Sequence, residues 1–324
     1  MQDRQNNSSI FSFSKEQVSL IKQITVFFIP VVLCYAVLEW SVIIIPMSYD
    51  KVQQQITTKP DAIKVMVLGS SQMQAAVNPA FLDKVTVNYG SKSQHHKEDN
   101  HIMEQSMVRF PNLETIVFEL SYAHLEIPHN GKDFWKNTIY LKYYNVNAFE
   151  RNTYFKDKLV FLSSPSMYAK KFTQYYLNDD DQEEYNQYGY HTNNFKGAFS
   201  DLDYNDEKIT LRKFRIRDRE SLANFAINTP FFYDMIRTAI ANKKKVIISC
   251  IPTYKTYLNK RNPAILKRRD SILEDIRLKF PEVRFFNLEL DTITFRARDY
   301  LNENHLNPDG AEKFTKKLNQ VLND

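Results

Sequence analysis

The sequence predicts an α/β domain with a doubly wound parallel sheet in three layers, preceded by one transmembrane helix. From residue 63 onward, short apolar runs of strand length alternate with segments of helical periodicity, a rhythm typical of parallel sheets. Before them, the apolar segment at residues 24–46 is long enough to cross a bilayer. Hydrophobic residues make up 43% of the chain, which is enough for a sizeable core.

Five apolar runs have the length and composition of strands, and helical periodicity separates them. The expected strands are Lys64 to Leu68, Val85 to Tyr89, Thr115 to Glu119, Lys243 to Pro252 and Val283 to Leu288. The expected helices are Lys97 to Val108, a helix opening at Thr229-Pro230, and Pro263 to Phe280. In such a sheet a site is expected at the carboxyl edge of the strands.

The N-terminal part divides into a polar tail at residues 1–22, a membrane anchor at 23–48 and a polar connector at 49–62. A cleavable signal peptide is the alternative, but the apolar run is too long for one and no clear small-residue cleavage site follows. Glu39 is the only charge in the run and is expensive in a bilayer, so it is expected to reach the interface or face a partner helix.

Residues 63–324 form the α/β domain, with an insertion at about 126–220 that is rich in Tyr, Phe and Asn. Packed helices with an exposed acidic loop over the sheet edge are expected there; a carbohydrate-stacking aromatic surface is the alternative. A calcium site at Asp179 to Asp181 is a weaker alternative, because the acidic run lacks EF-hand spacing.

The composition and the missing motifs argue against several classes of function. The net charge is +5, and acidic and basic residues are interleaved, so no nucleic-acid partner is expected. The chain has no CxxC, HExxH or Walker-type motif, so no metal and no cofactor are expected. The two cysteines, Cys34 and Cys250, lie in an apolar segment and a strand, so no disulfide is expected between them.

A candidate nucleophile follows the first strand of the domain. Gly69 ends that strand, Ser70 and Ser71 come next, and a helical turn begins after them. This arrangement places a hydroxyl at the carboxyl edge of the sheet, beside free helix N–H groups that favour a developing anion. The alternative is a serine that serves only as a helix cap.

A candidate general base lies near the end of the chain. His305 precedes a turn cluster at residues 307–310 and a helix whose apolar face includes Phe314 and Leu318. A histidine on such a loop can accept a proton near neutral pH. The alternative is an ordinary surface histidine. Three of the six glycines, Gly69, Gly90 and Gly310, fall in these motif stretches, which indicates special backbone geometry there.

Together these stretches resemble the SGNH/GDSL hydrolase superfamily, particularly its membrane-anchored bacterial members. The first block of that superfamily, Gly-Asp-Ser, corresponds to Gly69 to Ser71, and its last block, Asp-x-x-His-Leu, corresponds to Asn302 to Leu306. Val87 to Gln94 resembles the second block, and Glu114 to Leu125 resembles the third strand with its exit loop.

The resemblance implies roles for individual residues. Ser71 is implied as the nucleophile and His305 as its base, with Asn302 at the position that orients the imidazole. The N–H groups of Ser71 and Gly90 are implied as oxyanion donors. Gln94 or Ser121 is implied in place of the family's asparagine donor, and Asp299 or Glu303 as substitute orienters of the histidine.

The chain departs from the family pattern in three ways: Ser70 and Asn302 stand where the family has Asp, and the family's asparagine donor is not evident after Glu119. Two functional classes therefore stay open. One is a membrane-anchored serine esterase or O-acyltransferase that acts on an O-acylated cell-envelope glycan, with its domain outside the cytoplasm. The other is a catalytically silent module that binds glycan or assists a membrane acyltransferase partner.

Overall fold

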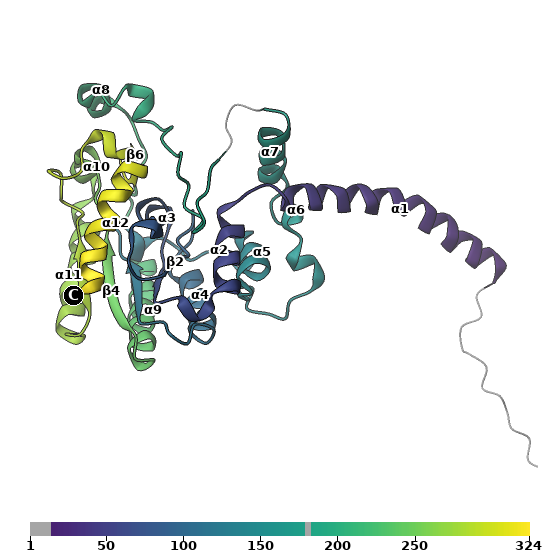
Figure 1. The fold of residues 1–324 in the computed structure, drawn as a ribbon, viewed down its shortest axis with the longest axis horizontal. Coiled ribbons are helices and arrows are strands. Elements are labelled where there is room, and N and C mark those ends of the chain that lie inside the picture. The colour runs from purple at the N-terminus through teal and green to yellow at the C-terminus, as the bar shows by residue number, and fades with distance from the viewer. Residues whose placement is uncertain (1–13, 179–182) are drawn as a thin grey trace, which may run out of the picture. The chain divides into compact units, whose positions relative to one another are not determined.

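The computed structural model describes residues 14–178 and 183–324, which form two compact units (Figure 1). The first unit contains the chain up to Ile45 together with residues 159–178. The second contains residues 46–158 and 183–324. The insertion expected at 126–220 is therefore shared between the two units, because its residues from Leu159 to 178 pack with the N-terminal helix.

The first unit is built on one long apolar helix, α1 (Lys15–Ile43), with the short helices α6 (Val160–Ser163) and α7 (Pro165–Tyr176). Ser14 caps α1 by accepting the Gln17 N–H at 3.2 Å, and the Gln17 side chain accepts the Ser14 N–H at 2.9 Å. The helix thus begins at Lys15, inside the stretch expected to be a polar tail. Among the described residues, α1 alone is long and apolar enough to cross a membrane, a test that a signal sequence also passes.

The one charge expected within the apolar run has its partners inside this unit. The Glu39 carboxylate accepts the backbone N–H groups of Val160 and Phe161, at 2.5 and 2.8 Å. These are the first N–H groups of α6, which have no acceptor within their own helix. Glu39 therefore caps a helix of the insertion, a role for which its neighbours in the sequence give no signal.

The second unit contains the five-stranded parallel sheet that the sequence predicts, with strand order β2-β1-β3-β4-β5. The strands are β1 (Val65–Val67), β2 (Thr86–Asn88), β3 (Thr115–Glu119), β4 (Lys245–Cys250) and β5 (Arg284–Asn287). All five expected strands are present, most of them shorter than expected. An antiparallel hairpin of β6 (Tyr300–Asn302) and β7 (His305–Leu306) is added near the end of the chain.

Helices cover both faces of the sheet, which makes three layers. On one face α3 (Ser71–Ala76) and α12 (Pro308–Asn323) pack on Val67, Val117 and Ile247 in the main core cluster. The other face carries α4 (His96–Met107), α9 (Leu222–Ala241) and α11 (Pro263–Lys279). There the ring of Phe118 meets Phe232 of α9 at 6.0 Å, and Arg277 of α11 lies over Phe285 at 4.6 Å. The predicted doubly wound fold is confirmed.

The connector expected at 49–62 contains the helix α2 (Ser48–Thr58), which buries Val52 and Ile56. One local expectation is wrong. The helix expected to open at Thr229-Pro230 is α9, which begins at Leu222 with Ser221 as its cap and carries Pro230 in its interior. A 20-residue helix with a buried face tolerates the one hydrogen bond that a proline removes.

The remaining short elements lie mostly in the insertion and its flanks. The helices are α5 (Lys136–Ile139), α8 (Asp206–Leu211) and α10 (Lys255–Lys260). Single turns are Pro60–Ala62, Pro79–Phe81, His124–Glu126, Phe155–Lys158, Ser200–Leu202 and Ala297–Asp299, with a π-helical turn at Tyr140–Tyr144. Tyr140, Tyr144 and Tyr190 are buried and pack inside the protein, whereas Tyr154 and Phe155 are exposed, so the alternative of an aromatic stacking surface stays a prediction. The calcium alternative at Asp179 to Asp181 lies outside the described residues. Cys34 and Cys250 are both free, as expected.

Candidate active site

The candidate site lies where the winding of the sheet changes direction. Strand β1 is flanked by β2 and β3, so the connections leaving β1 and β3 diverge at their carboxyl ends. Gly69, Ser70 and Ser71 follow β1, and Glu119 is the last residue of β3. Main-chain topology therefore brings these side chains to one crevice at the edge of the sheet.

The structure brings Ser71 and His305 together across 234 positions of sequence, with Ser71 Oγ 2.8 Å from His305 Nε2. Ser71 is the first residue of α3, and His305 is the first residue of β7, in a hairpin rather than an irregular loop. Helix α12 follows the hairpin closely. A Cβ atom on Gly310 would lie 2.2 Å from the Asp299 carbonyl oxygen, so only glycine allows this approach.

Two asparagine side chains hold the imidazole of His305. Its Nδ1 lies 3.0 Å from both Asn302 Oδ1 and Asn304 Oδ1. The Asn304 backbone N–H also donates to Asn302 Oδ1 at 3.1 Å, which turns the oxygen of that amide toward the ring. Nδ1 must then carry the hydrogen, and Nε2 presents a lone pair to the Ser71 hydroxyl. This is the tautomer that a general base requires.

The surroundings of the imidazole keep it neutral. Burial lowers the pKa of His305 to about 4; the charge of Glu119 acts in the opposite direction, and that of Lys92 lowers the pKa further. At neutral pH the histidine is therefore unprotonated and ready to accept the proton of Ser71.

The lowered pKa of His305 predicts the acid limb of the pH profile, that is, the pH range in which kcat/KM falls as the pH is lowered. A base with a pKa of about 4 loses its function only as the pH falls through that value. We expect kcat/KM for 4-nitrophenyl acetate to stay level from pH 7 to pH 5 and to halve near pH 4. A midpoint near 6.5, the value of an unperturbed histidine, would contradict this assignment.

The substitution Asn302→Asp is expected to move the acid limb of kcat/KM to higher pH. A carboxylate beside Nδ1 favours the imidazolium, so the pKa of His305 should rise by about one to three units. The same charge would stabilise the imidazolium formed during the reaction and raise kcat by about tenfold. The pH dependence of kcat/KM measures both effects. Asn304→Asp, which places a charge at the other amide, is the matched comparison, and an unshifted limb in both variants would contradict the proposed contact.

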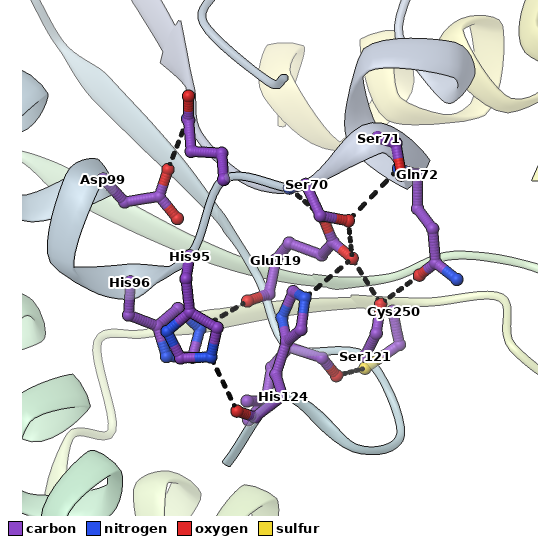
Figure 2. A network of polar contacts seen from close by, with 12 residues as sticks. Ser70, Ser71, Gln72, His95, His96, Asp99, Glu119, Ser121, His124 and Cys250 are labelled. Carbon is purple, nitrogen blue, oxygen red and sulfur yellow. Dashed lines mark hydrogen bonds and ion pairs between the residues drawn. The ribbon is translucent and has the colours of Figure 1, made fainter. Parts of the chain in front are cut away.

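Glu119 organises the segment that carries the nucleophile, as Figure 2 shows. Its carboxylate is buried and accepts the Ser70 N–H at 2.7 Å and the Ser70 hydroxyl at 3.1 Å. Gly69 makes room for it, because a Cβ atom there would lie 2.5 Å from Glu119 Oε2, and its φ of +146° also favours glycine. Sequence reasoning missed Glu119. The available signal was an acidic residue at the end of an otherwise apolar strand.

The two backbone N–H groups expected to bind the oxyanion, those of Ser71 and Gly90, differ in whether they already have an acceptor. The Ser71 N–H is at the first position of α3, where a helix offers no internal acceptor, and it meets none among the described residues. The Gly90 N–H, in contrast, donates to Asn88 Oδ1 at 2.9 Å, so the expectation that it is a free donor is contradicted. Gly90 has a steric role, since a Cβ atom would lie 2.8 Å from the Gln74 nitrogen.

The side chains of Gln94 and Ser121 are also engaged in hydrogen bonds within the protein. The Gln94 amide is buried, donates to the Tyr89 carbonyl at 3.0 Å and to Asp99 at 2.7 Å, and accepts from Tyr140 at 2.8 Å. It therefore braces the second strand's loop and is no free oxyanion donor. The Ser121 hydroxyl lies 2.5 Å from both Glu119 Oε1 and Gln72 Oε1, which ties it to the Glu119 network.

The two substitute orienters do not face His305, because each carboxylate pairs with a cation elsewhere. Asp299 binds Lys313 at 2.8 and 2.9 Å, and Glu303 binds Arg212 at 2.6 and 2.8 Å. Of the residues expected behind the imidazole, the structure places only Asn302 in contact with it.

A group of buried histidines adjoins Glu119 and was not expected. His124 Nε2 lies 3.6 Å from Glu119 Oε1, and His96 Nε2 lies 3.3 Å from the Glu119 carbonyl oxygen. Burial lowers the pKa of His95 to about 3 and that of His96 well below its usual value, so these rings are neutral packing elements. Within residues 14–178 and 183–324, no group of three His, Cys, Asp or Glu side chains is arranged to hold a metal ion.

Neither a protein-family model nor a curated protein matches this chain. Among solved structures, it is similar to a candidate acylhydrolase of Bacteroides fragilis, with 10% identity, a TM-score of 0.39, and 84% of this chain and 95% of that one covered. It is similar to a GDSL-like lipase of Bacteroides thetaiotaomicron, with 10% identity, a TM-score of 0.38, and coverage of 83% and 98%. A Streptococcus pneumoniae protein described as a candidate platelet activating factor has 10% identity, a TM-score of 0.39, and coverage of 85% and 91%. These likenesses are weak, so the assignment of the site rests on the geometry of this chain.

Proposed function

We propose that this chain is a serine esterase or O-acyltransferase with Ser71 as its nucleophile and His305 as its general base. One observation carries the proposal: the 2.8 Å contact between Ser71 Oγ and the His305 nitrogen whose lone pair faces it. A serine used only as a helix cap would direct its oxygen to a backbone N–H. Ser70 does so instead, because its hydroxyl accepts the Gln72 N–H.

The reaction begins when Ser71 Oγ attacks the carbonyl carbon of an ester and its proton moves to His305 Nε2. The carbonyl oxygen becomes an anion, and the free Ser71 N–H is placed to stabilise it. The imidazolium then gives the proton to the alcohol oxygen as the C–O bond breaks, which leaves an acyl-serine. Attack on the acyl group by water gives hydrolysis, and attack by a sugar hydroxyl gives transfer, with His305 again accepting the proton.

Among the described residues, the side chains that contact His305 Nδ1 are two amides and not a carboxylate, and this difference affects the mechanism. In serine proteases, replacing the orienting Asp by Asn costs about 10⁴ in kcat because the histidine adopts the wrong tautomer. Here the Asn304 N–H fixes the Asn302 amide, so that loss does not arise. The charge that favours the imidazolium comes instead from Glu119.

The finer assignment extends this proposal to the substrate and the location. An O-acylated cell-envelope glycan is the proposed substrate, and the resemblance of the motifs to membrane-anchored SGNH proteins supports it. The apolar helix α1 supports a single-pass anchor, with the catalytic domain outside the cytoplasm. A membrane acyltransferase is a proposed partner on the same basis.

Covalent labelling tests the proposal directly. A fluorophosphonate probe should modify the full-length protein in neutral detergent, and peptide mapping should place the modification on Ser71. In the His305→Ala variant, labelling of Ser71 should be much slower, because the Ser71 hydroxyl loses its general base. A folded protein that is not labelled would favour the catalytically silent module instead.

A further inference from the structure

A groove of about 530 Å³ opens directly beside the candidate base. Its lining residues come from two segments, the irregular segment after α8 and the β6–β7 hairpin; they are Arg212, Lys213, Phe214, Arg215, Asn302, Glu303 and Asn304. Two of these, Asn302 and Asn304, are the residues whose oxygens hold His305 Nδ1. These two side chains therefore lie between the groove and the imidazole of His305, and the volume of the groove is in the range of small-ligand sites.

The charges on this groove are unbalanced. Three cations line it with a single carboxylate, that of Glu303, which is buried and bound to Arg212. Arg212 thus holds the turn that carries His305. Lys213 and Arg215 are exposed and meet no carboxylate among the described residues. Their charges are free to meet a ligand.

Further cations lie close to the groove and the base. Lys260 Nζ sits over the ring of Phe214, 4.2 Å from its centroid. Lys92 is exposed on the loop after β2, near enough for its charge to act on His305. An anion that approached the candidate site would therefore meet positive charge from the groove and from Lys92, an arrangement that raises local concentration and association rates.

We propose that the groove binds an anionic group, a carboxylate or a phosphate, carried by the alcohol part of the ester substrate. This inference rests on the proposed function. His305 protonates the leaving alcohol from Nε2, whereas Asn302 and Asn304, which border the groove, contact Nδ1 on the other side of the ring. A sugar-sized alcohol that extends past the imidazole would therefore place its anionic group in the groove. The substrate class is then an acylated acidic sugar, such as a uronic acid or a sugar phosphate, and Lys213 with Arg215 determines the preference for it.

Three small esters test this preference: methyl 3-O-acetyl-glucoside, the corresponding glucuronide, and the glucoside 6-phosphate. Full-length protein in neutral detergent should cleave an acidic ester with the higher kcat/KM, and the better of the two acidic esters identifies the anion. Lys213→Gln/Arg215→Gln should reduce the acidic-to-neutral ratio by about tenfold at low salt, as expected for two exposed charge pairs. The ratio for the unaltered protein should fall as salt screens those charges.

The matched control removes two exposed cations at the opposite edge of the sheet. Lys243 lies in the turn before β4 and Lys245 is the first residue of β4, at the amino edge of the sheet, and Lys243→Gln/Lys245→Gln should keep the ratio. An unchanged ratio in Lys213→Gln/Arg215→Gln, with all three esters cleaved, would overturn the groove while leaving the esterase intact.

Binding separates failure of the groove from failure of the proposed function. Polygalacturonate should bind full-length Ser71→Ala protein in low salt, and Lys213→Gln/Arg215→Gln should weaken this binding by about tenfold. If no ester is cleaved but this weakening is seen, the anion site stands and the serine chemistry does not. Binding that is equal with and without the two cations overturns the anion site.

Discussion

Ser71→Ala is expected to lower kcat/KM for a simple acetyl ester by about 10⁴-fold or more, since removal of a catalytic serine has effects of this size. Among the described residues, the Ser71 hydroxyl is the nucleophile in contact with His305 Nε2, 2.8 Å away, and it would form the acyl intermediate. Ser71 is partly exposed, and within the described part of the chain its hydroxyl forms a hydrogen bond with the imidazole alone, so the variant should fold normally. Initial rates with 4-nitrophenyl acetate, compared at equal protein concentration, measure the loss.

Two other serines serve as controls for this result. Ser271→Ala removes a hydroxyl on α11 that bonds only the Arg268 carbonyl, so it should leave the rate unchanged. Ser70→Ala removes the neighbouring hydroxyl, which caps α3 and contacts Glu119, and it should lower the rate while keeping covalent labelling on Ser71. If Ser71→Ala kept more than a tenth of the activity, or if labelling moved to Ser70, the assignment of the nucleophile would be wrong.

Glu119→Ala is expected to lower both stability and activity. It leaves the Ser70 N–H without its buried acceptor, and lost hydrogen bonds to a charged group make unfolding easier by about 2–4 kcal/mol. The Ser70 turn would then shift the neighbouring nucleophile, and a displacement of about 1 Å can cost about 10²-fold in rate. Urea unfolding of the full-length protein measures the stability, and kcat/KM for 4-nitrophenyl acetate measures the activity.

A third measurement tests whether Glu119 affects the pKa of His305 as well as the stability of the fold. Its charge raises the pKa of His305, so Glu119→Gln, which removes the charge with little change of shape, should move the acid limb of kcat/KM to lower pH. Glu126→Ala is the matched control, because Glu126 is equally buried but binds Ser221 and Arg268. It should lose stability without moving the limb. A limb that stays in place in Glu119→Gln would leave Glu119 a purely structural residue.

Local patterns in the sequence were sufficient to predict the sheet and the two ends of the candidate site. Apolar runs at β1 and β3 reflect burial on both faces, a property each strand shows by itself. Ser71 after a strand and a glycine, and His305 before a turn, were recognisable for the same reason. The start of α9 was misplaced because Thr229-Pro230 is an equally good local start signal, and the burial of Phe232 and Met235 does not distinguish the two starts.

The sequence by itself determined the five strands of the sheet, the apolar first helix, and the serine and histidine of the candidate site, because each depends on residues adjacent in the chain. Only the tertiary structure decided which polar groups are free and which are taken. Gly90 and Gln94 are satisfied by Asn88 and Asp99, Asp299 and Glu303 by cations, and Glu119 holds Ser70 from another strand. A hydrogen bond consumes a donor at one specific partner, and that partner can lie anywhere in the chain, so occupancy cannot be inferred from residue type and spacing.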